Sequence, residues 1–163
     1  MMFGVMFNAA IASGTFGIAR GALRAFTDVM ETRVSTQGVS ARTSPGQLER
    51  LATAESDVDA SINHFQSIID QLYDHVESGG EISVSQRIQF RRDQVRATQW
   101  CITAVDDLFR GAGSGSMVFG HPVERAWRDL HVAGTHVCNT TELPYAAWGA
   151  HRFGAPVPPN AQY

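Results

Sequence analysis

The residues best suited to chemistry lie in one stretch near the carboxyl end, where a Gly/Ser loop precedes a segment rich in histidine. The loop comprises residues 111–116, and the segment that follows runs from His121 to His136. Free N–H groups at a helix N-terminus attract phosphate, and an imidazole changes charge near neutral pH. We therefore expect the loop to bind an anion and His136 to transfer a proton. The structural alternatives are a plain connection between helices and a histidine that is hydrogen-bonded inside the protein.

The helix expected to start at Pro122 groups several of these side chains. Arg125, Asp129, Val132 and His136 recur at intervals that place them on one helix face. Arg125 and Asp129 are four residues apart and are expected to form an ion pair. Spacing alone leaves open whether His136 is a general base or a structural histidine.

Other polar clusters have structural explanations. The arginines of the segment 87–96, with Asp93 beside them, are expected to form surface or intersubunit ion pairs. An apolar seam is predicted along residues 45–78, with Leu48, Leu51, Val58, Ile62, Phe65, Ile69, Leu72 and Val76. Glu55 interrupts this seam and therefore needs a partner, for which Arg91 is one candidate, or a shifted pKa. Arg91 and Thr98 in turn interrupt the apolar stripe of their own helix.

The composition excludes several classes of protein. The 163-residue chain is 44% hydrophobic and 18% charged, with a net charge of −3, which is typical of a globular domain rather than a nucleic-acid-binding protein. No segment reaches the ~20 uninterrupted apolar residues of a membrane span. Cys101 and Cys138 are far apart and lack metal-ligand spacing, so we expect no disulfide framework, no metal site and a cytoplasmic location.

Helical periodicity dominates the chain, because apolar residues recur every three to four positions. Ser44 and Ser83 each precede a glutamine by three residues, which predicts a capping box at the start of two helices. Helices are predicted over residues 5–34, 45–78, 83–111, from 122 to just before Pro144, and as a short piece over 145–152.

These helices predict an all-α fold, an up-down-up-down four-helix bundle in a single domain over residues 1–163. Gly14, Gly17 and Gly21 leave room on the first helix for a close neighbour. The long apolar seams leave surface for another copy of the chain. We therefore expect a homo-oligomer, specifically a tetramer.

The stretch His121-Pro-Val-Glu-Arg-Ala-Trp-Arg-Asp129, with a histidine seven residues later, resembles part of the C-terminal helical domain of the acyl-CoA dehydrogenase superfamily. Within that superfamily it is most similar to the two-component flavin-dependent monooxygenases, which include the p-hydroxyphenylacetate hydroxylase oxygenases. The resemblance in helix order and length covers nearly the whole chain. Acyl-CoA dehydrogenases proper carry a glutamate base near the place of His136, and that difference favours the monooxygenase branch.

The resemblance implies a role for each part of this stretch. His136 would lie against the flavin and the substrate, helping to deprotonate a phenol or to stabilise the flavin hydroperoxide. Gly113 and Ser114, with their neighbours Gly111 and Ser116, would contact the phosphate region of the flavin. The implied enzyme is the oxygenase component of a monooxygenase, which takes reduced FMN or FAD from a separate flavin reductase and hydroxylates a small aromatic substrate with O₂.

Members of that family also carry an N-terminal helical domain and a β-barrel domain that these residues do not include. The resemblance therefore implies that the chain is the C-terminal part of a longer protein and is inactive alone. Two alternatives stay open. One is an acyl-CoA dehydrogenase-type oxidoreductase, in which Glu142 would have to supply the base, and the other is a non-catalytic helical oligomerisation module. The sequence determines neither the substrate nor the choice between FMN and FAD.

Overall fold

The computed structural model describes residues 3–158, 160–161 and 163. Within them the chain is helical, with one isolated antiparallel bridge between Val34 and Ser40 in the first connection. The helices are α1 (Phe3–Thr32), the 3₁₀ turn η1 (Ala41–Thr43), α2 (Pro45–Glu77), α3 (Val84–Ala112), the 3₁₀ turn η2 (Ser114–Ser116), α4 (Pro122–Gly134) and α5 (Glu142–Arg152). The predicted all-α fold is confirmed.

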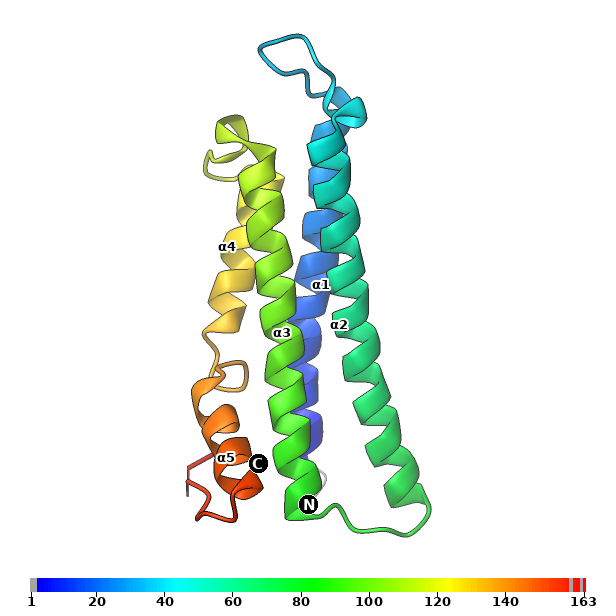
Figure 1. The fold of residues 1–163 in the computed structure, drawn as a ribbon, viewed down its shortest axis with the longest axis vertical. Coiled ribbons are helices and arrows are strands. Elements are labelled where there is room, and N and C mark those ends of the chain that lie inside the picture. Colours follow the sequence, from blue (N-terminus) through cyan, green and yellow to red (C-terminus); the bar gives the residue numbers. More distant parts are fainter. Residues whose placement is uncertain (1–2, 159, 162) are drawn as a thin grey trace.

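The helices form four columns that run alternately up and down (Figure 1). α1 and α3 lie in the middle and contact each other, and both contact α2 and α4. In the described residues α2 and α4 do not touch, so α1 and α3 form the central diagonal of the bundle. α5 packs on α3 below α4 and continues the fourth column (Figure 1).

The start of α3 is built as predicted, and the start of α2 only in part. Ser83 and Gln86 form a capping box, in which each side chain accepts from the other residue's main-chain N–H. Pro45 occupies the first turn of α2, but Ser44 makes no side-chain capping bond. Gln47, the expected partner, turns its amide toward the end of α3 instead, where it contacts Gly111.

The buried face of α2 differs from the predicted seam. Its buried residues include Ala54 and Ser61, whose small side chains let α3 approach closely. Ile62 and Ile69, which were expected in the seam, are only half-buried. Glu55 is exposed, so it needs no buried partner, and its expected pairing with Arg91 is wrong. Val58, Phe65 and Leu72 of the predicted seam are buried as expected. A small rotation of α2 buries Ala54, Ser61 and Ile68 in place of Glu55, Ile62 and Ile69.

The fourth predicted helix is two helices. α4 ends at Gly134, and α5 begins at Glu142 with Pro144 in its first turn, where a proline removes no helical hydrogen bond. A turn over residues 135–141 joins them. The prediction of a helix that continues to just before Pro144 is therefore wrong, because polar groups in this turn cap α4 early.

In the described residues, the glycines of α1 lie beside open space and not against a closely packed helix. A Cβ at Gly14, Gly17 or Gly21 would find no atom within 4 Å among the described residues. A groove of about 420 Å³ runs past Gly17 between α1 and α2, with Phe16 and Ile69 among its lining residues. The expected close packing is not made inside this chain.

Candidate functional site

The Gly/Ser loop of residues 111–116 is held by Arg33, which directly follows α1, and by Gln47 of α2. Arg33 donates from Nη1 to the main-chain oxygen of Gly111, at 2.9 Å, and to that of Ala112. Gln47 donates from Nε2 to the same oxygen of Gly111 at 3.2 Å. These donors satisfy carbonyl groups that the C-terminal end of α3 leaves without a helical partner.

Two glycines of the loop allow arginines to approach. Gly113 has a φ of 75°, in the left-handed region that favours glycine. A Cβ at Gly113 would overlap the guanidinium of Arg33, and a Cβ at Gly111 would overlap the side chain of Arg50. Arg50 is fixed by an ion pair of 2.9 Å with Asp107. The loop therefore lies beside the guanidinium of Arg33, which suits an anion, whereas the charge of Arg50 is balanced by Asp107.

The two serines of the loop differ in access. The Ser116 side chain is buried, and its Oγ donates to the main-chain oxygen of Ala112 at 3.1 Å. Ser114 is exposed at the start of η2, next to the open position of Gly115. Of the predicted cofactor residues, Ser114 is thus the side chain that a ligand can reach, whereas Ser116 stabilises the loop.

The N-terminus of α4 is already occupied by the protein's own groups. Residues 117–120 separate it from the Gly/Ser loop, so the predicted junction of loop and helix is wrong. His121 accepts the N–H of Val123 on Nδ1 at 3.2 Å. The carboxylate of Glu124 accepts the N–H of Gly120 at 3.0 Å and places a negative charge there. An anion would therefore bind at the loop beside Arg33 rather than at the start of α4.

His136 lies in the turn after α4, with an exposed side chain. Its Nδ1 accepts the main-chain N–H of Cys138 at 3.2 Å, and its carbonyl oxygen accepts the N–H of Asn139 at 2.7 Å. The prediction that His136 shares a helix face with Arg125 and Asp129 is wrong, because the helix ends before it. Arg125 and Asp129 form the expected ion pair, at 3.5 Å and exposed to solvent.

Beneath this turn lies a buried polar cluster from the middle of α3. Arg91 is only 2% exposed, and Gln94 and Asn139 are fully buried. Arg91 donates from Nη1 to the main-chain oxygen of Cys138 at 2.8 Å, and Gln94 donates from Nε2 to the same oxygen at 2.7 Å. Burial lowers the pKa of the Arg91 guanidinium, and it raises the pKa of the Cys138 thiol. The predicted surface role of Arg91 is wrong.

A second cluster joins α3 to α4. Trp127 donates from Nε1 to Oδ1 of Asp106 at 2.7 Å and stacks on Phe109 with ring centroids 4.6 Å apart. His131 lies against the Trp127 ring, with its Nδ1 2.9 Å from the main-chain oxygen of Trp127 and its Nε2 3.3 Å from Asp106. This cluster is half-buried and packs α4 onto α3.

The structure separates the two parts of the predicted site. The loop lies at one end of α4 and the His136 turn at the other (Figure 1). α4 has 13 residues, so the two ends are about 20 Å apart at a rise of about 1.5 Å per residue. One flavin could contact both only by lying along α4, or the two parts would serve different ligand molecules.

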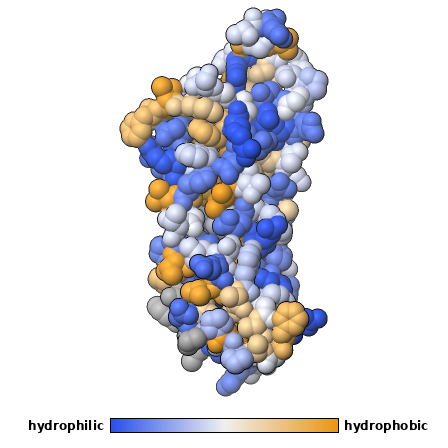
Figure 2. Space-filling view, turned by 60° about the vertical axis from the view of Figure 1, so that its left-hand side comes forward, coloured by the Kyte–Doolittle hydropathy of each residue, from blue (hydrophilic) through white to orange (hydrophobic). Residues whose placement is uncertain are grey.

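Apolar side chains surround the His136 turn on the surface. Val132 is 66% exposed and Val137 51% exposed. Figure 2, which brings the α4 and α5 side forward, shows hydrophobic patches on this part of the molecule. An exposed histidine among apolar side chains suits contact with a flat aromatic group.

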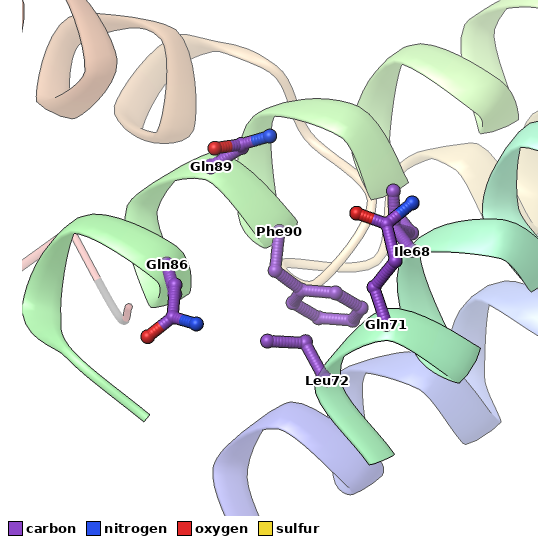
Figure 3. A pocket seen from close by; sticks show the side chains of 6 residues that line it. All are labelled: Ile68, Gln71, Leu72, Gln86, Gln89 and Phe90. Atoms are coloured by element: carbon purple, nitrogen blue, oxygen red, sulfur yellow. The ribbon is translucent and has the colours of Figure 1, made fainter. Parts of the chain in front are cut away.

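A separate hollow between α2 and α3 lacks the features of a reaction site. It has a volume of about 80 Å³, and the Phe90 ring lies beside the Leu72 side chain in it (Figure 3). Its lining contains glutamines and apolar residues but no charged group and no histidine. In the described residues no group of three or more His, Cys, Asp or Glu side chains is placed to hold a metal ion. None of the described helices has the length and apolar character needed to cross a bilayer.

Comparison with known families decides the identity of the domain. The family described as "Acyl-CoA dehydrogenase, C-terminal domain" matches residues 9–141. The chain belongs to this family. Its helical columns and the turn that carries His136 are therefore those of an acyl-CoA dehydrogenase C-terminal domain.

Several relatives of the chain are oxygenase components of flavin-dependent monooxygenases. The chain is 33% identical over 159 residues to HsaA, the oxygenase subunit of a flavin-dependent monooxygenase of Rhodococcus jostii (strain RHA1). This match covers 96% of the present chain and 42% of HsaA. It is 28% identical over 162 residues to the oxygenase component of the FADH(2)-dependent resorcinol hydroxylase of Rhizobium sp. (strain MTP-10005), covering 94% and 39%. The predicted resemblance to the monooxygenase branch is confirmed.

A solved structure shows the same fold. The crystal structure of the 3-HSA hydroxylase from Rhodococcus sp. RHA1 superposes with a TM-score of 0.89 at 32% identity, over 100% of this chain and 42% of that one. The chain thus spans about two fifths of the length of the relatives it matches.

Proposed function

We propose that this chain is the C-terminal bundle of the oxygenase component of a reduced-flavin-dependent monooxygenase that hydroxylates a small aromatic substrate with O₂. The observation that carries the proposal is the match of 96% of the chain to an oxygenase subunit, together with a histidine at the turn after α4. The remaining length of such relatives supports the further proposal that the chain is the C-terminal part of a longer protein.

In this proposal His136 is the acid/base residue. Its side chain is exposed, and so are those of Val132 and Val137 near it in the chain, so that a flavin and an aromatic substrate could lie against this surface. Bound reduced flavin would supply two electrons, so that one oxygen atom of O₂ enters the substrate and the other leaves as water. His136 would hold a proton at Nε2, because its Nδ1 already accepts the N–H of Cys138, and direct it toward a reacting oxygen atom.

The loop would bind the phosphate of the cofactor. Gly111 and Gly113 admit Arg50 and Arg33 to the back of the loop, and Ser114 presents its hydroxyl on the open side. Ser116 would act by keeping the loop closed. Either FAD or FMN has the phosphate that this site requires. The separation of loop and histidine by the length of α4 supports FAD, the longer of the two, as does the FADH(2) dependence of the resorcinol hydroxylase relative.

The same proposal includes partners and location. A separate flavin reductase would supply the reduced cofactor, since the relatives are named as oxygenase subunits or components. A homotetramer would cover the apolar groove between α1 and α2 and the glycines beside it. Buried free thiols at Cys101 and Cys138 suit a reducing cytoplasm.

The experiment uses the full-length protein that contains this chain. Anaerobic titration with reduced FAD and with reduced FMN measures binding, and a separate reductase with O₂ and a set of small phenols measures hydroxylation. The proposal predicts saturable binding of reduced flavin and a hydroxylated product that appears only when the reductase is present. Reduction of the flavin by an acyl thioester, without any reductase, would instead establish the acyl-CoA dehydrogenase-type alternative.

One observation favours a second candidate, a helical assembly module without catalysis. His136 faces outward from this bundle rather than into a groove within it. Such a module would form the same oligomer and show no saturable binding of reduced flavin. The titration therefore separates the two candidates before any turnover is measured.

A further inference from the structure

We infer that Arg91, Gln94 and Asn139 are positioning residues, which hold the turn of His136 so that its neutral ring donates a hydrogen bond from Nε2. The inference rests on the proposed function, because it concerns the residue assigned there to proton transfer. It also makes a statement about the histidine itself that can be measured without turnover.

The cluster ties the turn to α3 through one carbonyl group. The main-chain oxygen of Cys138 accepts from Nη1 of Arg91 at 2.8 Å and from Nε2 of Gln94 at 2.7 Å. Arg91 also donates to Oε1 of Gln94. Two donors on one carbonyl fix the peptide plane that follows Cys138, two residues from His136.

Asn139 ties the same turn to the end of α4. Its Oδ1 accepts from Gln94 at 3.1 Å, and its Nδ2 donates to the main-chain oxygen of Ala133 at 2.9 Å. The side chain therefore joins the last turn of α4, the turn of residues 135–141 and α3. These bonds hold the main chain at Ala133, before His136, and at Cys138, after it.

The burial of this cluster argues that it has a use beyond packing. Gln94 and Asn139 have no exposed surface and Arg91 has 2%. Buried polar groups cost stability unless they are hydrogen-bonded, and an apolar replacement of the same volume is often as stable. Most hydrogen bonds of this cluster are made to the turn of residues 135–141, so the cluster defines the geometry of that turn. The turn that it defines carries His136, whose ring accepts the N–H of Cys138.

The positioned turn selects one form of the histidine ring. The N–H of Cys138 points at Nδ1 of His136 at 3.2 Å, and an amide N–H can only donate. Nδ1 must therefore be the unprotonated nitrogen, and the proton of the neutral ring is on Nε2. In that state Nε2 donates a hydrogen bond to an oxygen atom of the ligand and does not accept a proton from it. Two roles are expected for His136, deprotonation of a phenol and stabilisation of the flavin hydroperoxide. The geometry points to the second, in which the ring donates a hydrogen bond.

The first arm of the test is spectroscopic. Protein labelled with ¹⁵N-histidine gives the protonation of each ring nitrogen, and replacing His121, His131 and His136 one at a time assigns the signals. We expect the proton on Nε2 for neutral His136. His131 is the internal contrast, because its Nδ1 faces the main-chain oxygen of Trp127, which can only accept, and so carries a proton. A proton on Nδ1 of neutral His136 overturns the inference, whether or not the protein proves to be an enzyme.

The second arm removes the positioning groups. Gln94→Met keeps the side-chain volume and removes the two hydrogen bonds that Nε2 of Gln94 donates, to the Cys138 oxygen and to Oδ1 of Asn139. The His136 signal should therefore become a mixture of tautomers. In the full-length enzyme kcat should fall by about 10-fold to 100-fold, as expected for a misplaced catalytic group. Asn139→Ala leaves both bonds to the Cys138 oxygen and should shift the same signals less. This milder variant keeps the inference testable if Gln94→Met does not fold.

The matched control is Thr98→Val, one turn further along α3. Thr98 is fully buried, and its hydroxyl has no hydrogen-bond partner among the described residues. This variant should leave the His136 tautomer and kcat as in the wild type. The inference is overturned if Gln94→Met and Asn139→Ala also leave the tautomer unchanged, or if all three variants perturb it equally. Absence of hydroxylation in the wild type would count against the proposed function alone.

Discussion

Gln94, in the middle of α3, donates a hydrogen bond of 2.7 Å to the main-chain oxygen of Cys138, in the turn between α4 and α5. This bond crosses from a central helix of the bundle to the surface segment that carries His136. A rigid helix thereby supports a short irregular segment, which is how folds generally place reactive side chains with precision. The bundle therefore fixes the position of the turn that carries His136.

The Gly/Ser loop should be sensitive to substitution at Gly113. Gly113→Ala forces a side chain into a φ of 75° and displaces Arg33 from the oxygens of Gly111 and Ala112. We expect the free energy of unfolding to fall by about 1–3 kcal/mol, measured by urea denaturation. Gly115→Ala is the matched control, because nothing lies within 4 Å of a Cβ there. Equal stability of the two variants would show that the arginine contact has no energetic weight.

Stability should decrease at high pH through Cys101. Burial raises the pKa of this thiol from 9.0 to about 11, and a hydrogen bond with Ser61 only partly opposes the change. The unfolded chain loses the proton first, so the stabilisation is complete below pH 9 and is lost as the pH rises toward 11.

At about 1.4 kcal/mol per pKa unit the loss approaches about 3 kcal/mol. The measurement is urea denaturation from pH 8 to 11 of the wild type and of Cys101→Ala, which cannot titrate at this position. The difference in unfolding free energy between the two should shrink as the pH rises. A difference that stays constant across this range would mean that the thiol titrates normally in the folded protein.

The hydrogen bond from Trp127 to Asp106 should stabilise the contact of α4 with α3. Trp127→Phe keeps the stacking on Phe109 and removes the 2.7 Å bond. The control is Trp100→Phe, which makes the same change of ring at a tryptophan that stacks on Arg96. We expect Trp127→Phe to cost about 1 kcal/mol more than the control, the usual contribution of one hydrogen bond. Thermal unfolding of both variants measures this, and a larger loss for Trp100→Phe would contradict it.

The sequence predicts the long helices well because their signals are local. The capping box at Ser83 and the proline after Ser44 mark the starts of α3 and α2, and Gly79 follows the end of α2. The rotation of α2 about its axis is not local. Ala54 and Ser61 are buried because α3 approaches them closely, so the apolar pattern alone placed Glu55 in the seam.

The end of α4 could not be predicted for a related reason. The side chain of Asn139 reaches back to the oxygen of Ala133 at 2.9 Å, and it is held there by Gln94 from another helix. A contact between residues so far apart leaves no periodic signal in the sequence. The one available sign is that Arg91 and Thr98 interrupt the apolar stripe of α3, which marks a polar group inside the core.

The sequence proposes residues for the candidate site but does not predict how they are arranged in space. Gly111, Gly113 and Ser114 form a loop beside Arg33, as a phosphate site requires, but Arg33 comes from the segment just after α1 and is not foreseen by the motif. His136 is separated from that loop by the whole of α4. Motif spacing counts residues along the chain, whereas this distance depends on where the helix ends.

The most direct test of the account compares two substitutions of His136 in the full-length protein with reductase, reduced flavin and an accepted phenol. His136→Asn keeps an acceptor for the Cys138 N–H but has no group at the position of Nε2, whereas His136→Gln places an amide there. The quantity measured is product formed per O₂ consumed, with H₂O₂ as the alternative product. The account predicts a large loss of product and a rise in H₂O₂ for His136→Asn, and a smaller change for His136→Gln. Wild-type coupling in His136→Asn would contradict it.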